Sequence, residues 1–281
     1  MSDEPKQEQN GRGTKTLLIG PPGSGKTTSL VTCIEAGLDL FVLGTDPGFE
    51  ESLLDAMERK NLPIEKLHYH YVAPATAPWS ALINSAQQIN GFDYETLTKL
   101  KSGISKSSYT QFIELLTVLS DFTDQRTGES FGPVDDFPPD CFLAIDSLSG
   151  INIMAMDLMV GGKPTPHQGE WGVAMNAEEK LLLKLTSDLK CFFCLTAHVE
   201  KEKDAISGMP LIMVSALGSK LAPKIPRTFS DVVLAVKEGD KFTWSTGAIG
   251  VDLKGRSLPI ADGLEPSFEQ IVEIWKRRNA Q

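Results

Sequence analysis

The fold of this 281-residue chain is decided by Gly20-Pro21-Pro22-Gly23-Ser24-Gly25-Lys26-Thr27. This stretch fits the pattern Gly-x-x-x-x-Gly-Lys-Thr, follows the apolar run at 16–19 and opens a segment of helical character at 26–36. Glycines in such a loop let backbone N–H groups turn inward around phosphate oxygens. The rival interpretation, a turn that is merely rich in glycine, leaves the Gly-Lys-Thr ending at the helix start unexplained. The stretch therefore predicts a phosphate-binding loop (P-loop) between a strand and a helix.

The ligand expected at this loop is ATP with Mg²⁺. Lys26 would reach the terminal phosphates, and the Thr27 hydroxyl would bind the metal ion. The residues expected to hold the nucleotide are Gly20, Pro21, Pro22, Gly23, Ser24, Gly25, Lys26, Thr27 and Thr28.

Two further carboxylates follow apolar runs. Asp146 comes directly after the run at 141–145 and is expected to bind Mg²⁺ together with Thr27, although it could instead cap the next helix in competition with Ser147. Asp46 follows the run at 38–43 and is the first choice for the carboxylate that orients the attacking water, with Glu50 and Glu51 as alternatives. The Asp-Pro-Gly sequence at 46–48 is equally compatible with a simple turn.

Apolar runs alternate with helical patterns along the chain. Strands are expected at 16–19, 38–43, 68–72, 141–145, 191–197, 230–236 and 241–245, and helices at 26–36, 50–60, 79–90, 109–122, 148–159, 173–189 and 268–278. Because most of these strands are apolar throughout, the pattern predicts an α/β fold with a mainly parallel sheet, flanking helices and C-terminal β-strands.

One large domain is expected. Residues 1–13 are polar and predict a flexible tail. The core would span 14–260, with an insertion at about 91–140 whose part at 123–140 is expected to be exposed rather than part of the core. Residues 261–281 would add a C-terminal helix that packs on the core.

Composition limits the partners and the compartment. The formal charge is −10 and the isoelectric point is about 5.0, so any contact with nucleic acid must come from local basic loops. No apolar run approaches the roughly 20 residues that span a bilayer, and the four cysteines lie in or beside apolar runs. We expect a protein with no membrane partner in a reducing cytoplasm, which would be the bacterial host cytoplasm if a phage encodes it.

The order of these parts resembles the RecA-like P-loop ATPase core over about residues 14–275. More narrowly, it resembles the bacteriophage AAA-domain ATPases with a RecA core that are grouped with single-strand annealing proteins. In RecA and RadA recombinases the strand after the P-loop helix ends in Thr-Glu, with a catalytic glutamate, and Thr45-Asp46 is similar. Aspartate is shorter by one methylene, so it must approach the water differently.

The resemblance also implies a sensor and DNA-facing loops. Leu195-Thr196-Ala197-His198 matches the strand end that reports the γ-phosphate, with His198 or Thr196 as the sensor, unless His198 is simply a solvated side chain at a strand end. The loops at 161–172 and 199–213 would face single-stranded DNA. Positive charge and a stacking surface would come from Lys163, His167, Trp171, Lys201 and Lys203. The acidic residues Glu170, Glu200, Glu202 and Asp204 in the same loops reduce this positive charge.

Lys254-Gly255-Arg256 resembles the Lys-x-Arg element with which DnaB-type helicases and RadA reach the nucleotide of a neighbouring subunit. Such a finger makes hydrolysis depend on assembly, which implies a homo-oligomer in the form of a ring or filament. The alternative is an ordinary basic turn.

The leading hypothesis is an ATPase that couples ATP binding and hydrolysis to the handling of single-stranded DNA in phage-type recombination or replication, with other proteins of that process as possible partners. The expected catalytic residues are Lys26, Asp46, Asp146, His198, Lys254 and Arg256. The rivals are a small-molecule or nucleotide kinase, and a module that uses ATP only to assemble.

Overall fold

The computed structural model describes residues 11–76, 79–91, 93, 95, 99, 109–161, 166–203, 210–218 and 220–279. Most of the predicted tail, much of 91–108 and the loop residues Lys163 and Asp204 lie outside the described residues. The tail expected up to residue 13 includes two residues that contact the core, because Gly13 N–H donates to Lys190 O and Arg12 O accepts from Trp275 Nε1.

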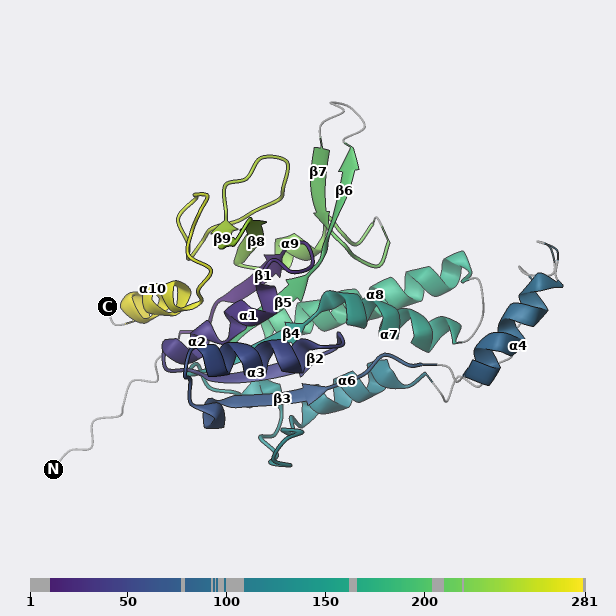
Figure 1. The fold of residues 1–281 in the computed structure, drawn as a ribbon, viewed down its shortest axis with the longest axis horizontal. Coiled ribbons are helices and arrows are strands. Elements are labelled where there is room, and N and C mark those ends of the chain that lie inside the picture. Colours follow the sequence, from purple (N-terminus) through teal and green to yellow (C-terminus); the bar gives the residue numbers. More distant parts are fainter. Residues whose placement is uncertain are drawn as a thin grey trace.

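A seven-stranded sheet in the order β3-β2-β4-β5-β1-β8-β9 forms the centre of the molecule (Figure 1). Its strands are β1 (Lys15–Ile19), β2 (Asp39–Gly44), β3 (Leu67–Tyr71), β4 (Cys141–Asp146), β5 (Phe192–Ala197), β8 (Asp231–Glu238) and β9 (Lys241–Ser245). All neighbours are parallel except β9, which runs antiparallel to β8. The predicted α/β fold class, with a mainly parallel sheet and C-terminal strands, is confirmed.

Helices cover both faces of this sheet. The helices that do so are α1 (Lys26–Leu30), α2 (Thr32–Glu35), α3 (Phe49–Arg59), α6 (Gln111–Ser120), α7 (Leu148–Val160), α8 (Gln168–Ser187), α9 (Ile225–Thr228) and α10 (Glu269–Asn279), whereas α4 (Trp79–Asn90) lies apart from the sheet (Figure 1). Alternate residues of each buried strand point to opposite faces. One face packs against α6, α7, α8 and α9 and includes Leu17 and Leu143, while the other packs against α1, α2, α3 and α10 and includes Leu18 and Phe142.

The segment at 123–140 is exposed over residues 125–130, but other parts of it pack into the core. Val134 and Phe137 are buried beside Phe122, and Asp124 is fully buried, where its carboxylate contacts His68 Nδ1 at 3.2 Å. Its glycine, proline and aspartate content predicted exposure, which holds for 125–130, whereas Val134 and Phe137 pack into the core.

Two loops expected to face DNA are also different in the structure. Helix α8 begins at Gln168 with a capping box between His167 and Glu170, so Trp171 lies in a helix rather than in a loop. The described residues of the segment at 199–213 belong to the antiparallel ribbon of β6 (Val199–Lys203) and β7 (Pro210–Val214), which stands out from the sheet (Figure 1).

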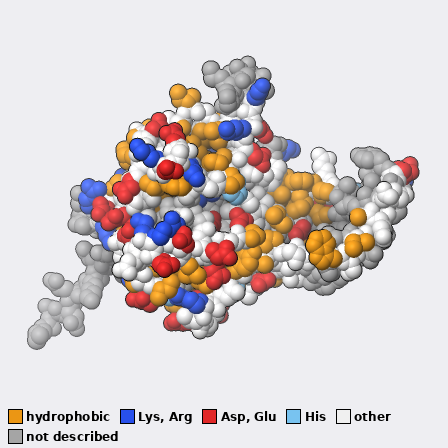
Figure 2. Space-filling view, viewed as in Figure 1, with side chains coloured by type: hydrophobic (Ala, Val, Ile, Leu, Met, Phe, Trp, Pro, Cys, Tyr) orange, Lys and Arg blue, Asp and Glu red, His pale blue; other side chains and the backbone are white. Residues whose placement is uncertain are grey.

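Helix α4 forms an arm that stands apart from the body (Figure 1). Trp79 is 81% exposed on this arm, and Ile113 and Leu116 are exposed on α6. Figure 2 shows apolar side chains gathered where the arm meets the body. Among the described residues, no helix combines the length and the apolar character needed to cross a membrane.

Candidate nucleotide-binding site

The P-loop leaves β1 and turns sharply into α1. Gly23 and Gly25 have φ angles of 71° and 83°, which glycine adopts without the steric cost that a Cβ brings. The Ser24 hydroxyl donates to Pro21 O at 2.8 Å and stabilises the turn. The loop therefore has the backbone conformation that turns N–H groups inward.

Lys26 lies over this loop. Its Nζ donates to Gly20 O at 2.8 Å and to Pro21 O at 2.9 Å, and the side chain is only 6% exposed. Burial lowers the pKa of Lys26, and the carboxylates of Asp146 and Asp46 raise it in part. An ammonium has three N–H donors, so a donor remains for a phosphate oxygen.

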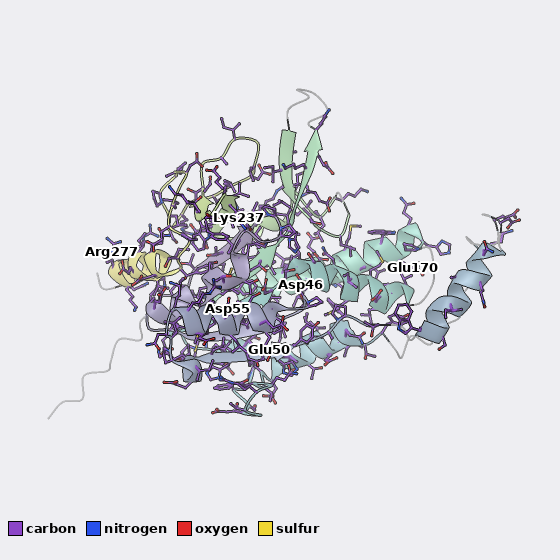
Figure 3. The ribbon with its side chains drawn as sticks, in the orientation of Figure 1. Asp46, Glu50, Asp55, Glu170, Lys237 and Arg277 are labelled. Carbon is purple, nitrogen blue, oxygen red and sulfur yellow. The ribbon has the colours of Figure 1, made fainter. Side chains whose placement is uncertain are left out.

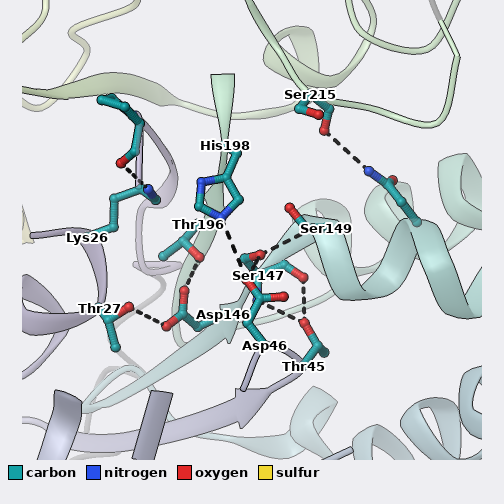
Figure 4. Close-up of polar contacts among 12 residues, drawn as sticks. Lys26, Thr27, Thr45, Asp46, Asp146, Ser147, Ser149, Thr196, His198 and Ser215 are labelled. Carbon is teal, nitrogen blue, oxygen red and sulfur yellow. Dashed lines mark hydrogen bonds and ion pairs between the residues drawn. The ribbon is translucent and has the colours of Figure 1, made fainter. Parts of the chain in front are cut away.

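Asp146 joins the P-loop to the neighbouring strands. Its Oδ2 accepts from the Thr27 hydroxyl at 2.7 Å, and its Oδ1 accepts from the Thr196 hydroxyl (Figure 4). Burial raises the pKa of Asp146, while the two hydroxyl donors oppose this change. Capping of α7 falls to Ser147, whose Oγ accepts from Ser149 N–H at 3.2 Å, so Asp146 does not serve as the cap.

Thr27 and Asp146 suit a magnesium ion. A hydroxyl oxygen and a carboxylate oxygen are the hard ligands that Mg²⁺ prefers, and in nucleotide sites Mg²⁺ takes its other ligands from phosphates and water. Within the described part of the chain, no cluster of three or more His, Cys, Asp or Glu side chains could hold a metal ion by itself. The donor set therefore fits a metal that arrives with a nucleotide.

Asp46 reaches the same edge of the sheet from β2. Its Oδ2 accepts from the Ser147 hydroxyl and lies 3.8 Å from His198 Nε2. The preceding Thr45 is fully buried, and its hydroxyl donates to Ser147 O at 2.7 Å and accepts from Ser147 N–H at 2.9 Å. These contacts fix the backbone on which Asp46 stands.

The structure separates the two sensor candidates. Thr196 is fully buried and donates to Asp146, so it holds the carboxylate. His198 is half-buried beside Asp46, and its buried Nδ1 has no hydrogen-bond partner within the part of the chain that the structure describes. His198 is therefore the residue that can respond to Asp46 and to whatever binds there.

A pocket of 250 Å³ contains this group. Its lining includes Lys26, Thr27, Asp46, Asp146 and His198. A second pocket of 250 Å³ shares Gly25 and Thr28 with the first and is bordered by Phe242, Arg59 and Glu265. The two pockets therefore adjoin each other at the start of α1.

The other predicted residues lie elsewhere. Glu50 accepts from the Tyr69 hydroxyl, which agrees with a structural role. Lys254 pairs with the start of β8 and donates to Pro226 O at 2.7 Å. Lys254 and Arg256 are therefore at the amino edge of the sheet, opposite the P-loop of their own chain.

Sequence reasoning missed the positioning roles of Thr45, Ser147 and Thr196. The parallel pairing of Gly44 with Asp146 brings Thr45 and Ser147 together. The pairing of Ile145 with Leu195 sets Asp146 beside Thr196. A polar residue directly after or near the end of each apolar strand was the signal that could have indicated these contacts.

Comparison with known proteins gives only distant similarities. No family model matches the chain, and no curated protein matches it. Among solved structures, a RadB recombinase is 13% identical, covering 90% of this chain and 86% of that chain with a TM-score of 0.39. The flagellar accessory protein FlaH from Methanocaldococcus jannaschii is 11% identical, covering 86% and 80% with a TM-score of 0.34. The fold class rests on the strand order and on the P-loop geometry described above.

Proposed function

We propose that this protein is a RecA-like P-loop ATPase that hydrolyses ATP to ADP and phosphate. One observation carries the proposal: Lys26, Thr27, Asp146 and Asp46 converge in one pocket at the carboxyl edge of a parallel sheet. Ligands of open α/β sheets bind at this edge. A P-loop alone indicates binding, whereas a second carboxylate across the pocket supports hydrolysis.

The P-loop N–H groups and Lys26 would hold the β- and γ-phosphates. Thr27 and Asp146 would hold Mg²⁺, which neutralises charge on the phosphates when bound. Ser147 and His198 both contact Oδ2 of Asp46. We assign the attacking water to its Oδ1. The water oxygen would attack the γ-phosphorus, the bond to ADP would break, and Asp46 would orient the water and accept its proton.

The second pocket would receive the nucleoside. It begins at Gly25 and Thr28, where the chain of phosphates would end, and Phe242 is 41% exposed at its border. An aromatic ring there can pack against a base. The two adjoining pockets therefore match a ligand with a phosphate end and an aromatic end.

Coupling to single-stranded DNA is proposed through the β6–β7 ribbon. Side chains alternate along a strand, so Lys201 and Lys203 share one face of β6 while Glu200 and Glu202 share the other. The ribbon follows His198 directly, and Ser215 N–H donates to His198 O at 2.9 Å. The basic face of β6 is thus connected to His198, which lies beside Asp46, and this connection supports a link between DNA binding and ATP hydrolysis. The process that we propose is phage-type recombination or replication.

The kinase alternative has less support. A kinase of this kind would close an arginine-rich lid over the phosphates, whereas the acidic segment at 123–140 contains Arg126 as its one arginine. The Arg126 side chain donates to Leu67 O at 2.7 Å and to Ile64 O at 3.1 Å. An arginine held there cannot cover the P-loop. The finger in trans at Lys254 and Arg256, and the ring or filament that it implies, stay predictions.

Phosphate release from ATP tests the proposal. The wild-type chain should hydrolyse ATP with Mg²⁺, and Lys26→Ala should lower the rate by about 10²-fold or more because an essential charge on the phosphates is lost. Lys180→Ala, an exposed lysine of α8, is the matched control and should retain the rate. Equal rates in both variants would contradict the proposal.

The same assay tests the DNA and assembly claims. Oligo-dT should raise the rate, and the rate per chain should rise with protein concentration if a neighbour completes the site. A rate that responds to neither would exclude both claims while leaving ATP hydrolysis intact.

A further inference from the structure

A basic pocket of 390 Å³ lies at the amino edge of the sheet, where β1 and β8 begin. Four of its lining residues are cationic: Arg12, Lys15, Arg256 and Arg278. The other lining residues carry no charge. Because β1 has five residues, this pocket is separated from the P-loop by about 16 Å of strand. It is therefore distinct from the nucleotide pocket.

Lys15 is the buried member of this group. It is 6% exposed, and its Nζ donates to Gly13 O at 2.9 Å and Cys191 O at 2.6 Å. Burial lowers the pKa of Lys15 to about 8, and the nearby Arg12 adds to the decrease. A buried ammonium that contacts only carbonyl oxygens gains stability from an anion beside its remaining N–H.

Two of the three guanidinium groups that line the pocket donate to backbone carbonyls. The Arg12 side chain donates to Ser187 O, and Arg278 Nη2 donates to Arg256 O at 3.0 Å. Each guanidinium has five N–H donors, so donors remain for a ligand. Asp231 lies nearby, but its Oδ1 accepts from the N–H groups of Arg256 and Ser257, and it does not line the pocket.

We propose that this amino-edge pocket binds a phosphate group. The chain carries a net charge of −10, so four cations around one cavity are not a result of general basicity. Guanidinium groups bind phosphate oxygens in pairs, and the Ser257 hydroxyl adds a neutral donor to the lining. The phosphate belongs either to a small anion or to the backbone of a single-stranded nucleic acid.

Two neighbouring arginines of α10 provide the test. Arg278 lines the pocket, whereas Arg277 does not, and both are exposed. Figure 3 shows Arg277 on α10 at the left edge of the body, well separated from Asp46 near its middle. The full chain would carry Lys26→Ala, which weakens phosphate binding at the P-loop. Binding of inorganic pyrophosphate would be measured by calorimetry and binding of labelled oligo-dT by fluorescence anisotropy.

Arg278→Gln should weaken binding of at least one probe by about fivefold or more, the effect of one charge-assisted contact, and Arg277→Gln should leave it within about twofold. Loss of oligo-dT binding identifies a nucleic-acid backbone, and loss of pyrophosphate binding alone identifies a small anion. Equal effects of the two variants on both probes, or binding of neither probe, would overturn the proposal.

If Arg278→Gln does not fold, Arg12→Gln replaces it. Lys26→Ala abolishes the proposed hydrolysis without touching this pocket, so the two proposals can fail separately.

Discussion

At the scale of single residues, the candidate site depends on a buried carboxylate with two hydroxyl donors. Asp146 is 4% exposed and accepts from Thr27 on one oxygen and from Thr196 on the other. A buried acceptor that loses its donor costs about 1–3 kcal/mol. Thr196, one of the two sensor candidates, does not line the nucleotide pocket, and its hydroxyl donates to Asp146, so its effect on folding can be measured directly.

Thr196→Val should lower the free energy of unfolding by about 1–3 kcal/mol, because it leaves Asp146 Oδ1 without its donor in a buried site. Urea denaturation measures this change. Thr186→Val removes a hydroxyl that donates to Leu182 O on α8, and it should lower the free energy of unfolding by less than Thr196→Val does. An equal cost for the two substitutions would mean that the Thr196 contact does not stabilise Asp146.

At the scale of elements, α8 contains a buried acid that the proposed mechanism does not use. Glu178 is fully buried, and among the described residues neither of its carboxylate oxygens has a hydrogen-bond partner. Burial raises the pKa of Glu178 from its ordinary value of 4.5 to about 8. The folded chain therefore keeps a proton that the unfolded chain releases.

This shift predicts how stability depends on pH. Between about pH 4.5 and 8 the native state binds the extra proton, so the free energy of unfolding should fall as pH rises through this window and level off above it. Glu178→Gln should remove this slope and make the protein more stable than wild type near pH 8, by an amount on the order of a few kcal/mol. Urea denaturation of both proteins at pH 5 and pH 8 measures this difference in the free energy of unfolding.

Glu179→Gln is the matched control, because Glu179 is the next residue and its carboxylate pairs with Lys224 at 2.9 Å on the surface. This variant should keep the wild-type pH dependence. If Glu178→Gln and Glu179→Gln show the same slope, Glu178 is not the group that titrates.

The elements also show where sequence reasoning succeeded and where it failed. Buried parallel strands are continuous apolar runs, so β1, β2, β4 and β5 could be predicted closely. The ribbon strand β6 reads Val-Glu-Lys-Glu-Lys and has no apolar face to reveal it. Helix α8 starts earlier than expected, since Gly169 and Gly172 suggested a loop but the His167–Glu170 capping box begins the helix.

At the scale of the whole molecule, the sheet brings the ends of four strands to one edge. The P-loop, Asp46, Asp146 and His198 could be predicted because each follows an apolar run, and parallel strands end at the same edge. The contacts among Thr45, Ser147 and Thr196 could not be predicted, because they depend on the register between strands that are far apart in the sequence. The amino-edge pocket likewise joins residues of both ends of the chain.

The central claim is that Asp46 acts on water while the P-loop holds ATP. The most direct measurement is the release of phosphate in a single turnover from ATP already bound with Mg²⁺, comparing wild type with Asp46→Asn. Asparagine preserves the size of the side chain but cannot accept the proton from water. We predict unchanged ATP affinity and a rate of phosphate release lower by about 10²-fold or more. Phosphate release at the wild-type rate from Asp46→Asn would contradict the claim.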